Sequence, residues 1–141
     1  MASVLRPPST EEEWRAYHAI RERVLWEARG LTGYDPDHPD ERAEGHHPLL
    51  YVLGEAPVGV VRVDIDGPTA TLRRVAVREE AQRRGHGREM LRLAEAFARS
   101  RGTSLVRSTV DADAVGFYRK AGYRAAGPPT RTGSVPMEKA L

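Results

Sequence analysis

A short loop rich in glycine and arginine carries the residues best suited to holding an anion. The loop reads Gln82-Arg83-Arg84-Gly85-His86-Gly87-Arg88, and it lies between a valine-rich strand and a predicted helix. Glycine lets the backbone approach a ligand without a side chain in the way. The first N–H groups of a helix lack acceptors within the helix and carry part of its positive dipole. The pattern therefore predicts a cradle for a pyrophosphate, with arginines that grip phosphate oxygens in pairs.

The spacing of the glycines excludes two familiar kinds of nucleotide-binding loop. A dinucleotide-binding turn requires a third glycine, but Gly87 is followed by Arg88, Glu89 and Met90. A P-loop requires Gly-Lys-Ser/Thr, which is also absent. The remaining pattern, Gln82-x-x-Gly85-x-Gly87, is a weak signal by itself, so its context decides what it indicates.

A second motif further along the chain supplies that context. It reads Ala114-Val115-Gly116-Phe117-Tyr118-Arg119-Lys120-Ala121-Gly122-Tyr123. Together and in this order, the two motifs resemble the Gln/Arg-x-x-Gly-x-Gly/Ala loop and the Ala-x-x-Phe/Leu-Tyr-x-Lys/Arg-x-Gly-Phe/Tyr helix of the GNAT superfamily of N-acyltransferases. The strand Arg74-Val75-Ala76-Val77 also looks like the one that leads into the loop in that superfamily. The resemblance covers residues 49–125 well and the first helix more loosely.

The resemblance implies a single domain over residues 1–141, with a mixed α/β (α+β) fold. Its central sheet would be mostly antiparallel, with one splayed parallel pair and flanking helices. The implied activity is acetyl-CoA-dependent N-acetyl transfer to a primary amine, by direct attack on the thioester. The cofactor-binding residues implied for acetyl-CoA, which is a cosubstrate, are Val75, Ala76 and Val77 along the pantetheine and Gln82, Arg83, Arg84, Gly85, His86, Gly87 and Arg88 around the pyrophosphate. One backbone N–H would lie near the thioester carbonyl, where it stabilises the developing oxyanion.

The catalytic residue that the resemblance implies is Tyr118, as the acid that protonates the departing thiolate. A phenol can do this if it lies within hydrogen-bond reach of the sulfur. The alternative is that Phe117 and Tyr118 are core aromatics on a helix face. At Asp111 the sequence departs from the superfamily, where many members have asparagine. An ionised aspartate cannot donate to the cofactor, and Asp111 is equally suited to cap the following helix.

No residue stands out as the general base. Some superfamily members carry a glutamate where this chain has Arg73 and Arg74, and arginine stays protonated. The remaining candidates are Asp64, Glu44, His46, His47 or a water relay. Arg62 and Asp64 share one face of a strand, so the alternative for Asp64 is an ion pair.

The elements that must position these residues follow from periodicity and turn signals. Ser9 and Thr10 with Glu12 and Glu13 form a capping-box pattern, which predicts a helix that ends at Gly30. We expect further helices over residues 87–101 and 112–120. We expect strands over residues 3–6, 49–53, 58–65, 69–77, 105–110, 123–126 and 134–139. Residues 31–48 are rich in proline and acids, and they predict a long loop with at most one short helix.

Composition narrows the function further. The chain lacks cysteine, which excludes disulfides, thiolate metal sites and a cysteine nucleophile. The chain has 22 Lys and Arg against 20 Asp and Glu, and no aromatic residues lie among the arginines. Both features argue against a nucleic-acid-binding protein. No apolar run approaches the roughly 20 residues of a membrane helix, so we expect a cytoplasmic protein that binds no membrane. A homodimer is left open.

The acceptor is predicted from the acidic loop. Asp35, Asp37, Asp40, Glu41 and Glu44 would attract a cationic small-molecule amine, although a solvated loop explains them equally well. Their spacing with His38 matches no recognised metal site, so we expect no metal. A catalytically weak acyl-CoA-binding sensor or partner protein is the rival to an active transferase, because the base is not evident. Tyr118 favours the transferase, since a pure binder needs no leaving-group acid.

Overall fold

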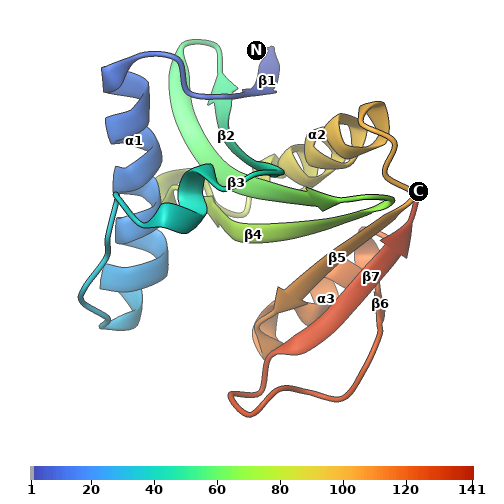
Figure 1. Cartoon of the computed structure of the whole chain (residues 1–141). Coiled ribbons are helices and arrows are strands. Elements are labelled where there is room, and N and C mark those ends of the chain that lie inside the picture. Colours follow the sequence, from blue (N-terminus) through green and yellow to red (C-terminus); the bar gives the residue numbers. More distant parts are fainter. Residues whose placement is uncertain (1) are drawn as a thin grey trace.

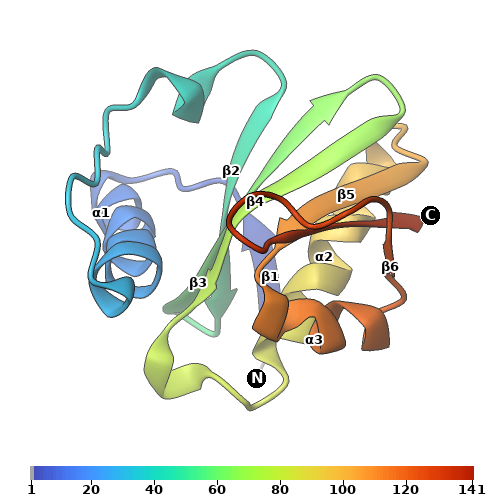
Figure 2. The same cartoon turned by 90° about the horizontal axis from the view of Figure 1, so that it is seen from below.

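The computed structural model describes residues 2–141, which form one seven-stranded sheet with helices on both faces (Figures 1 and 2). The strands are β1 (Ser3–Arg6), β2 (His46–Leu53), β3 (Ala56–Asp66), β4 (Thr69–Val77), β5 (Leu105–Val110), β6 (Arg124–Ala125) and β7 (Val135–Ala140). The α-helices are α1 (Glu11–Arg21), α2 (His86–Ser100) and α3 (Val115–Lys120). Shorter turns of helix are η1 (Glu22–Trp26), η2 (Glu27–Arg29), η3 (Pro39–Arg42), η4 (Glu79–Ala81) and η5 (Ala112–Ala114).

The sheet is mostly antiparallel, in the order β1-β2-β3-β4-β5-β7-β6. Only β4 and β5 run parallel, and they are paired over a short stretch, from Thr69 with Leu105 to Leu72 with Ser108. Beyond these pairs the two strands diverge, as Figure 1 shows. The mixed fold with a splayed parallel pair, predicted from the family resemblance, is thereby confirmed.

A bulge in β4 lies where the strands begin to diverge. Val60 pairs with Ala76 and Arg62 pairs with Arg73, so one residue of β3 faces two residues of β4. Arg74 takes the left-handed conformation, with φ of 58°. The extra residue of a bulge places two successive side chains on the same face of a sheet. Arg73 and Arg74 therefore both project from the face that α1 covers.

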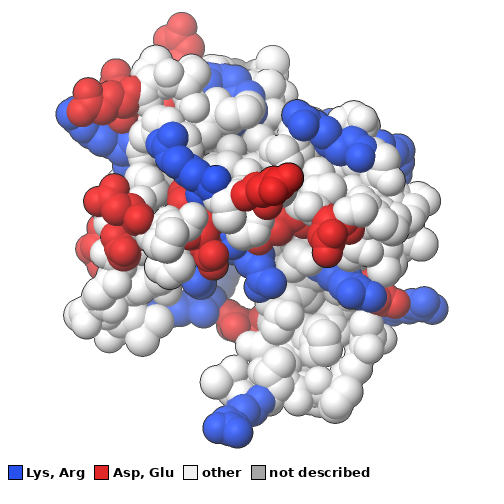
Figure 3. Space-filling view, in the orientation of Figure 1, with Lys and Arg blue, Asp and Glu red and all other residues white. Residues whose placement is uncertain are grey.

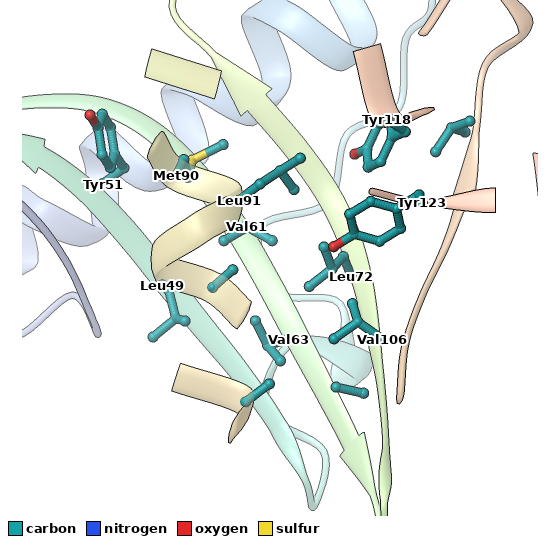
Figure 4. Close-up of a cluster of buried hydrophobic side chains, with 14 of the residues drawn as sticks. Leu49, Tyr51, Val61, Val63, Leu72, Met90, Leu91, Val106, Tyr118 and Tyr123 are labelled. Atoms are coloured by element: carbon teal, nitrogen blue, oxygen red, sulfur yellow. The ribbon is translucent and has the colours of Figure 1, made fainter. Parts of the chain in front are cut away.

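Two apolar clusters hold the helices against opposite faces of the sheet. The larger one packs α2 and α3 on the strands and includes Leu49, Val63, Leu72, Met90, Leu91, Ala94, Val106, Tyr118, Tyr123 and Met137 (Figure 4). The smaller one packs α1 and consists of Tyr17, Ile20, Leu50, Val52, Val60 and Ala76. Figure 2 shows α1 on one side of the sheet and α2 and α3 on the other.

The first helix begins at its predicted cap and ends at Arg21, while the helical run that it opens reaches the predicted Gly30. The N–H of Glu13 donates to the Thr10 hydroxyl at 3.1 Å, and the Glu13 carboxylate accepts from the Ser9 N–H at 2.9 Å. After α1 the chain continues through a π-helical and a 3₁₀ turn to Gly30, which takes the left-handed conformation of a helix C-cap. β2 begins at His46, earlier than predicted, because His46 pairs with Asp64 on β3.

Candidate active site at the diverging strands

The loop before α2 presents unpaired backbone donors. Gly85 is the N-cap of α2, with φ of 83°, and it has no side chain to cap the helix. The first helical bond runs from the Glu89 N–H to the Gly85 carbonyl at 3.1 Å. In the described part of the chain, the N–H groups of residues 86–88 find no acceptor. Open N–H groups on a 15-residue helix fit the requirement for a pyrophosphate cradle.

The arginines of this loop differ in how much they are already engaged. Arg83 and Arg84 are exposed and form no ion pair within residues 2–141. Arg83 also has a left-handed backbone, with φ of 63°. Arg88 donates to the Lys120 carbonyl at 3.3 Å, which connects the loop to the end of α3. Two guanidinium groups are therefore available to phosphate oxygens.

The end of β4 offers backbone groups to an extended ligand. The Arg78 N–H donates to the Val58 carbonyl on β3 at 2.8 Å. Since successive residues of a strand point their polar groups to opposite sides, those of Val75 and Val77 face the gap toward β5. Ala76 lies between these two residues, so its polar groups face β3, as those of Arg78 do. One group at the gap is already engaged, because the Gln82 amide donates to the Val77 carbonyl at 2.9 Å.

His86 and Gly87 have contacts that fix the start of α2. The His86 ring lies 3.2 Å from the Tyr51 hydroxyl, measured at Nδ1. A Cβ atom added at Gly87 would lie 3.3 Å from Cζ of Phe117, so a larger residue at this position would require the exposed Phe117 ring to shift. Gly87 therefore lets the two family motifs touch.

Tyr118 is both a core residue and a residue of the candidate site. Its side chain is 6% exposed and lies in the larger apolar cluster, with its ring 5.3 Å from that of Tyr123 (Figure 4). Burial raises the pKa of Tyr118, and the neighbouring Ser108 side chain partly offsets the rise. Ser108 is the last residue of β5 that pairs with β4. The Tyr118 hydroxyl therefore lies where the two strands separate, and it is protonated at neutral pH.

The candidates for the general base have other partners. Asp64 accepts from Arg62 at 2.8 Å and lies 3.3 Å from Arg73 and 3.4 Å from His46, so the ion pair predicted for it is present. His47 packs on Phe97, and burial together with nearby Arg101 lowers its pKa. Glu44 is exposed. These contacts single out none of the four side chains as a general base.

The acidic loop does not line the opening between β4 and β5. A pocket of about 330 Å³ at this opening is lined by Thr71, Arg73, Arg107, Ser108, Thr109, Ala126, Pro136, Met137 and Glu138. Asp37 and Glu41 instead line a second pocket of about 420 Å³, between α1 and η3. Figure 3 shows the hollow at the sheet opening, with both basic and acidic atoms around its rim.

Sequence reasoning missed a buried polar group under α1, which we call the Arg21 cluster and which consists of Tyr17, Arg21 and Glu41. Arg21 is 4% exposed and pairs with Glu41, which is 5% exposed. The Tyr17 hydroxyl donates to Glu41 at 2.8 Å and accepts from Arg21 at 3.0 Å. The sequence does contain a signal for this cluster. Arg21 follows Tyr17 by four residues and is next to Ile20, which puts an arginine on the apolar face of the helix.

Asp111 also has a partner that the sequence did not reveal. It occupies the N-cap position of η5, but its side chain makes no capping bond there. Its carboxylate instead pairs with Arg29, at the end of η2. This ion pair joins the segment after α1 to the end of β5.

Residues 2–141 lack the features of two other kinds of site. No helix there is both long enough and apolar enough to cross a membrane. No group of three or more His, Asp or Glu side chains is arranged there to hold a metal ion.

Comparison with known proteins places the chain in a family. The model of the acetyltransferase (GNAT) family matches residues 8–123. A Bacillus subtilis (strain 168) protein, provisionally named an acetyltransferase, is 29% identical over 121 residues, covering 84% of this chain and 81% of its own. A provisionally named N-acetyltransferase from Lactobacillus plantarum superposes with a TM-score of 0.82 at 24% identity, covering 99% of this chain and 97% of its own. The PaiA N-acetyltransferase of Thermoplasma acidophilum, solved with coenzyme A, superposes with a TM-score of 0.79 at 17% identity, over 100% of both chains. The chain therefore belongs to the acetyltransferase (GNAT) family, as its two motifs predicted.

Proposed function

We propose that this protein transfers an acetyl group from acetyl-CoA to the primary amine of a small molecule. The main support for the proposal is that two sets of unpaired backbone groups lie at the same place in the fold. The N–H groups at the start of α2 and the free edge of β4 meet at the same end of the sheet. An extended thioester that ends in a pyrophosphate can bind to both sets. Its extended part pairs with the edge of β4, and its pyrophosphate binds to the N–H groups at the start of α2.

Acetyl-CoA supplies the activated acyl carbon, and the residues of the chain bind and orient it. Arg83 and Arg84 neutralise the pyrophosphate together with the N–H groups of residues 86–88, and the backbone of Val75 and Val77 pairs with the pantetheine. As the amine nitrogen bonds to the acyl carbon, the carbon–sulfur bond breaks and Tyr118 protonates the thiolate. The nitrogen loses its proton to water. The buried, neutral phenol suits this role because it is protonated throughout the working pH range.

The test is thiol release from acetyl-CoA, followed with a disulfide dye across a panel of amines, amino acids, aminosugars and peptides. The chain has no cysteine, so every thiol detected comes from the cosubstrate. Release that depends on an added amine supports the proposal, and mass spectrometry of the product identifies the acceptor. Tight binding of acetyl-CoA without release for any amine would instead support a binding protein.

A further inference from the structure

The bulge in β4 gives Arg74 an unusual position. A non-glycine residue with φ of 58° is strained, and Arg74 adopts this conformation directly before Val75, at the edge of the gap. Its guanidinium carbon lies 5.1 Å from the centre of the Trp26 ring. Trp26 belongs to the segment after α1, so the side chain of Arg74 packs against that segment, while the preceding residue, Arg73, lines the pocket at the opening of the sheet.

Arg74 differs from the neighbouring arginines in its charged partners. Five other arginines at this end of the molecule have a carboxylate partner: Arg62 and Arg73 share Asp64, Arg107 and Arg124 share Glu138, and Arg29 pairs with Asp111. Within residues 2–141, Arg74 has neither an ion pair nor a side-chain hydrogen bond, and its guanidinium packs on the Trp26 ring alone.

The electrostatic surroundings of Arg74 are unfavourable for an isolated cation. Arg74 is exposed, but the chain packed around it removes part of its water shell, which lowers its pKa, and the nearby cations Arg21, Arg62 and Arg73 lower the pKa further. A guanidinium with all its donors free, backed by an aromatic ring and surrounded by positive charge, is arranged to receive an anion.

We propose that Arg74 binds an anionic group of the acceptor, a carboxylate or a phosphate, so that the substrate carries this group and the reactive amine in one small molecule. The inference rests on the proposed function, because it assigns the substrate class of the same site. Arg74 precedes Val75, whose polar groups face the gap, so an anion bound here holds the rest of the molecule at the opening of the sheet. The acidic loop, which led us to expect a cationic acceptor, lines the other pocket.

The experiment compares amines that differ only in their charge. The probes are glycine, L-alanine, L-leucine, β-alanine and 4-aminobutyrate, each beside its amide, with O-phosphoethanolamine to distinguish phosphate from carboxylate. The variant is Arg74→Asn, because asparagine tolerates the left-handed backbone at this position. The matched control is Arg15→Asn, which removes an exposed arginine from the outer side of α1.

The expected result is a loss that depends on the charge of the acceptor. Wild type favours the acid over its amide, or the phosphate over both. Arg74→Asn lowers kcat/KM for the favoured anion by about 10- to 100-fold through KM, while the value for the neutral amides changes less than about threefold. Arg15→Asn behaves as wild type. An equal loss for acids and amides would show that Arg74 only shapes the site, and would overturn the proposal, as would a wild-type preference for the amides.

A binding measurement keeps this inference separate from the transfer activity. Saturation-transfer NMR detects the N-acetyl derivatives of the same five acids, and N-acetyl-O-phosphoethanolamine, bound to the protein in the presence of coenzyme A. Binding to wild type but not to Arg74→Asn supports the anion site even if no amine releases thiol, in which case only the proposed function fails. Equal binding to both proteins, or binding to neither, overturns the anion site whatever the activity.

Discussion

The Arg21 cluster should contribute a large part of the stability of the α1 side of the molecule. Replacing Glu41 with glutamine keeps the shape of the side chain and an acceptor for Tyr17, but it removes the negative charge opposite Arg21. The guanidinium then lies in a buried site with one oxygen partner, the Tyr17 hydroxyl at 3.0 Å, and the Tyr17 ring at 5.0 Å from its central carbon. Its Nε already has no partner.

The size of the effect follows from burial. Removing one partner of a buried ion pair costs about 3–5 kcal/mol, because the other charge is left uncompensated. Tyr17 offsets part of this cost, so we expect Glu41→Gln to lower the free energy of unfolding by about 3 kcal/mol. Domains of this size are stable by about 5–15 kcal/mol in total. The variant should therefore still fold, with a Tm lower by about 10 °C.

Urea unfolding followed by circular dichroism measures this loss. We expect the midpoint to fall by about 1–2 M with an unchanged slope. Glu55→Gln, in the exposed turn between β2 and β3, is the control and should shift the free energy by less than about 0.5 kcal/mol. The double variant Arg21→Met, Glu41→Leu should recover most of the loss. A loss below about 1 kcal/mol for Glu41→Gln, or a double variant less stable than the single one, would refute the reasoning.

Three further outcomes are expected. Tyr118→Phe should lower kcat about 10²- to 10³-fold in stopped-flow kinetics, and it should change the Kd for coenzyme A less than about twofold in calorimetry. Unchanged turnover would exclude Tyr118 as the acid. Gly85→Leu should abolish coenzyme A binding, whereas the control Gly102→Leu should retain it, because Gly102 is equally strained, with φ of 88°, and equally free of close contacts. Normal affinity in the Gly85→Leu variant would contradict the pyrophosphate site. Burial lowers the pKa of both His18 and His47, so the unfolded chain binds more protons than the folded one near their ordinary pKa. Stability should therefore be complete above about pH 6.5 and fall below it, and the urea midpoint of a His18→Gln, His47→Gln variant should fall less; an identical pH profile would exclude these two rings as the cause.

Much of the fold could be predicted because its limits are set by local signals. β4 and β5 extend over the predicted residues, since the turn at Gly67 and the helix end at Gly102 determine where each strand starts. The cap at Thr10 fixed the start of α1 in the same way. The bulge at Arg74 could not be predicted, because it results from how β4 pairs with β3 and has no local sequence signal.

In the candidate site, too, the features set by local sequence could be predicted, and those set by contacts across the folded chain could not. The loop of residues 82–88 and Tyr118 are contained in contiguous motifs, so their placement near the diverging strands could be expected from the family resemblance. The partners of Glu41 and Asp111 could not, because Arg21 and Arg29 meet them only across the folded chain. The charge of the loop in sequence did not indicate these neighbours: Glu41 pairs with Arg21, and Asp37 and Glu41 line the pocket between α1 and η3.

The short pairing of β4 with β5 has a mechanical consequence. Four residue pairs alone connect the two strands, so the half of the sheet formed by β5, β6 and β7 is joined to the rest along a narrow seam. A ligand that hydrogen-bonds along the free edge of β4 acts as an additional strand and extends this seam. Acetyl-CoA would then be a structural member of the loaded enzyme as well as its reagent. Amide hydrogens of Val75 and Val77 should exchange quickly in the free protein and slowly when the cosubstrate is bound, because its departure reopens the seam.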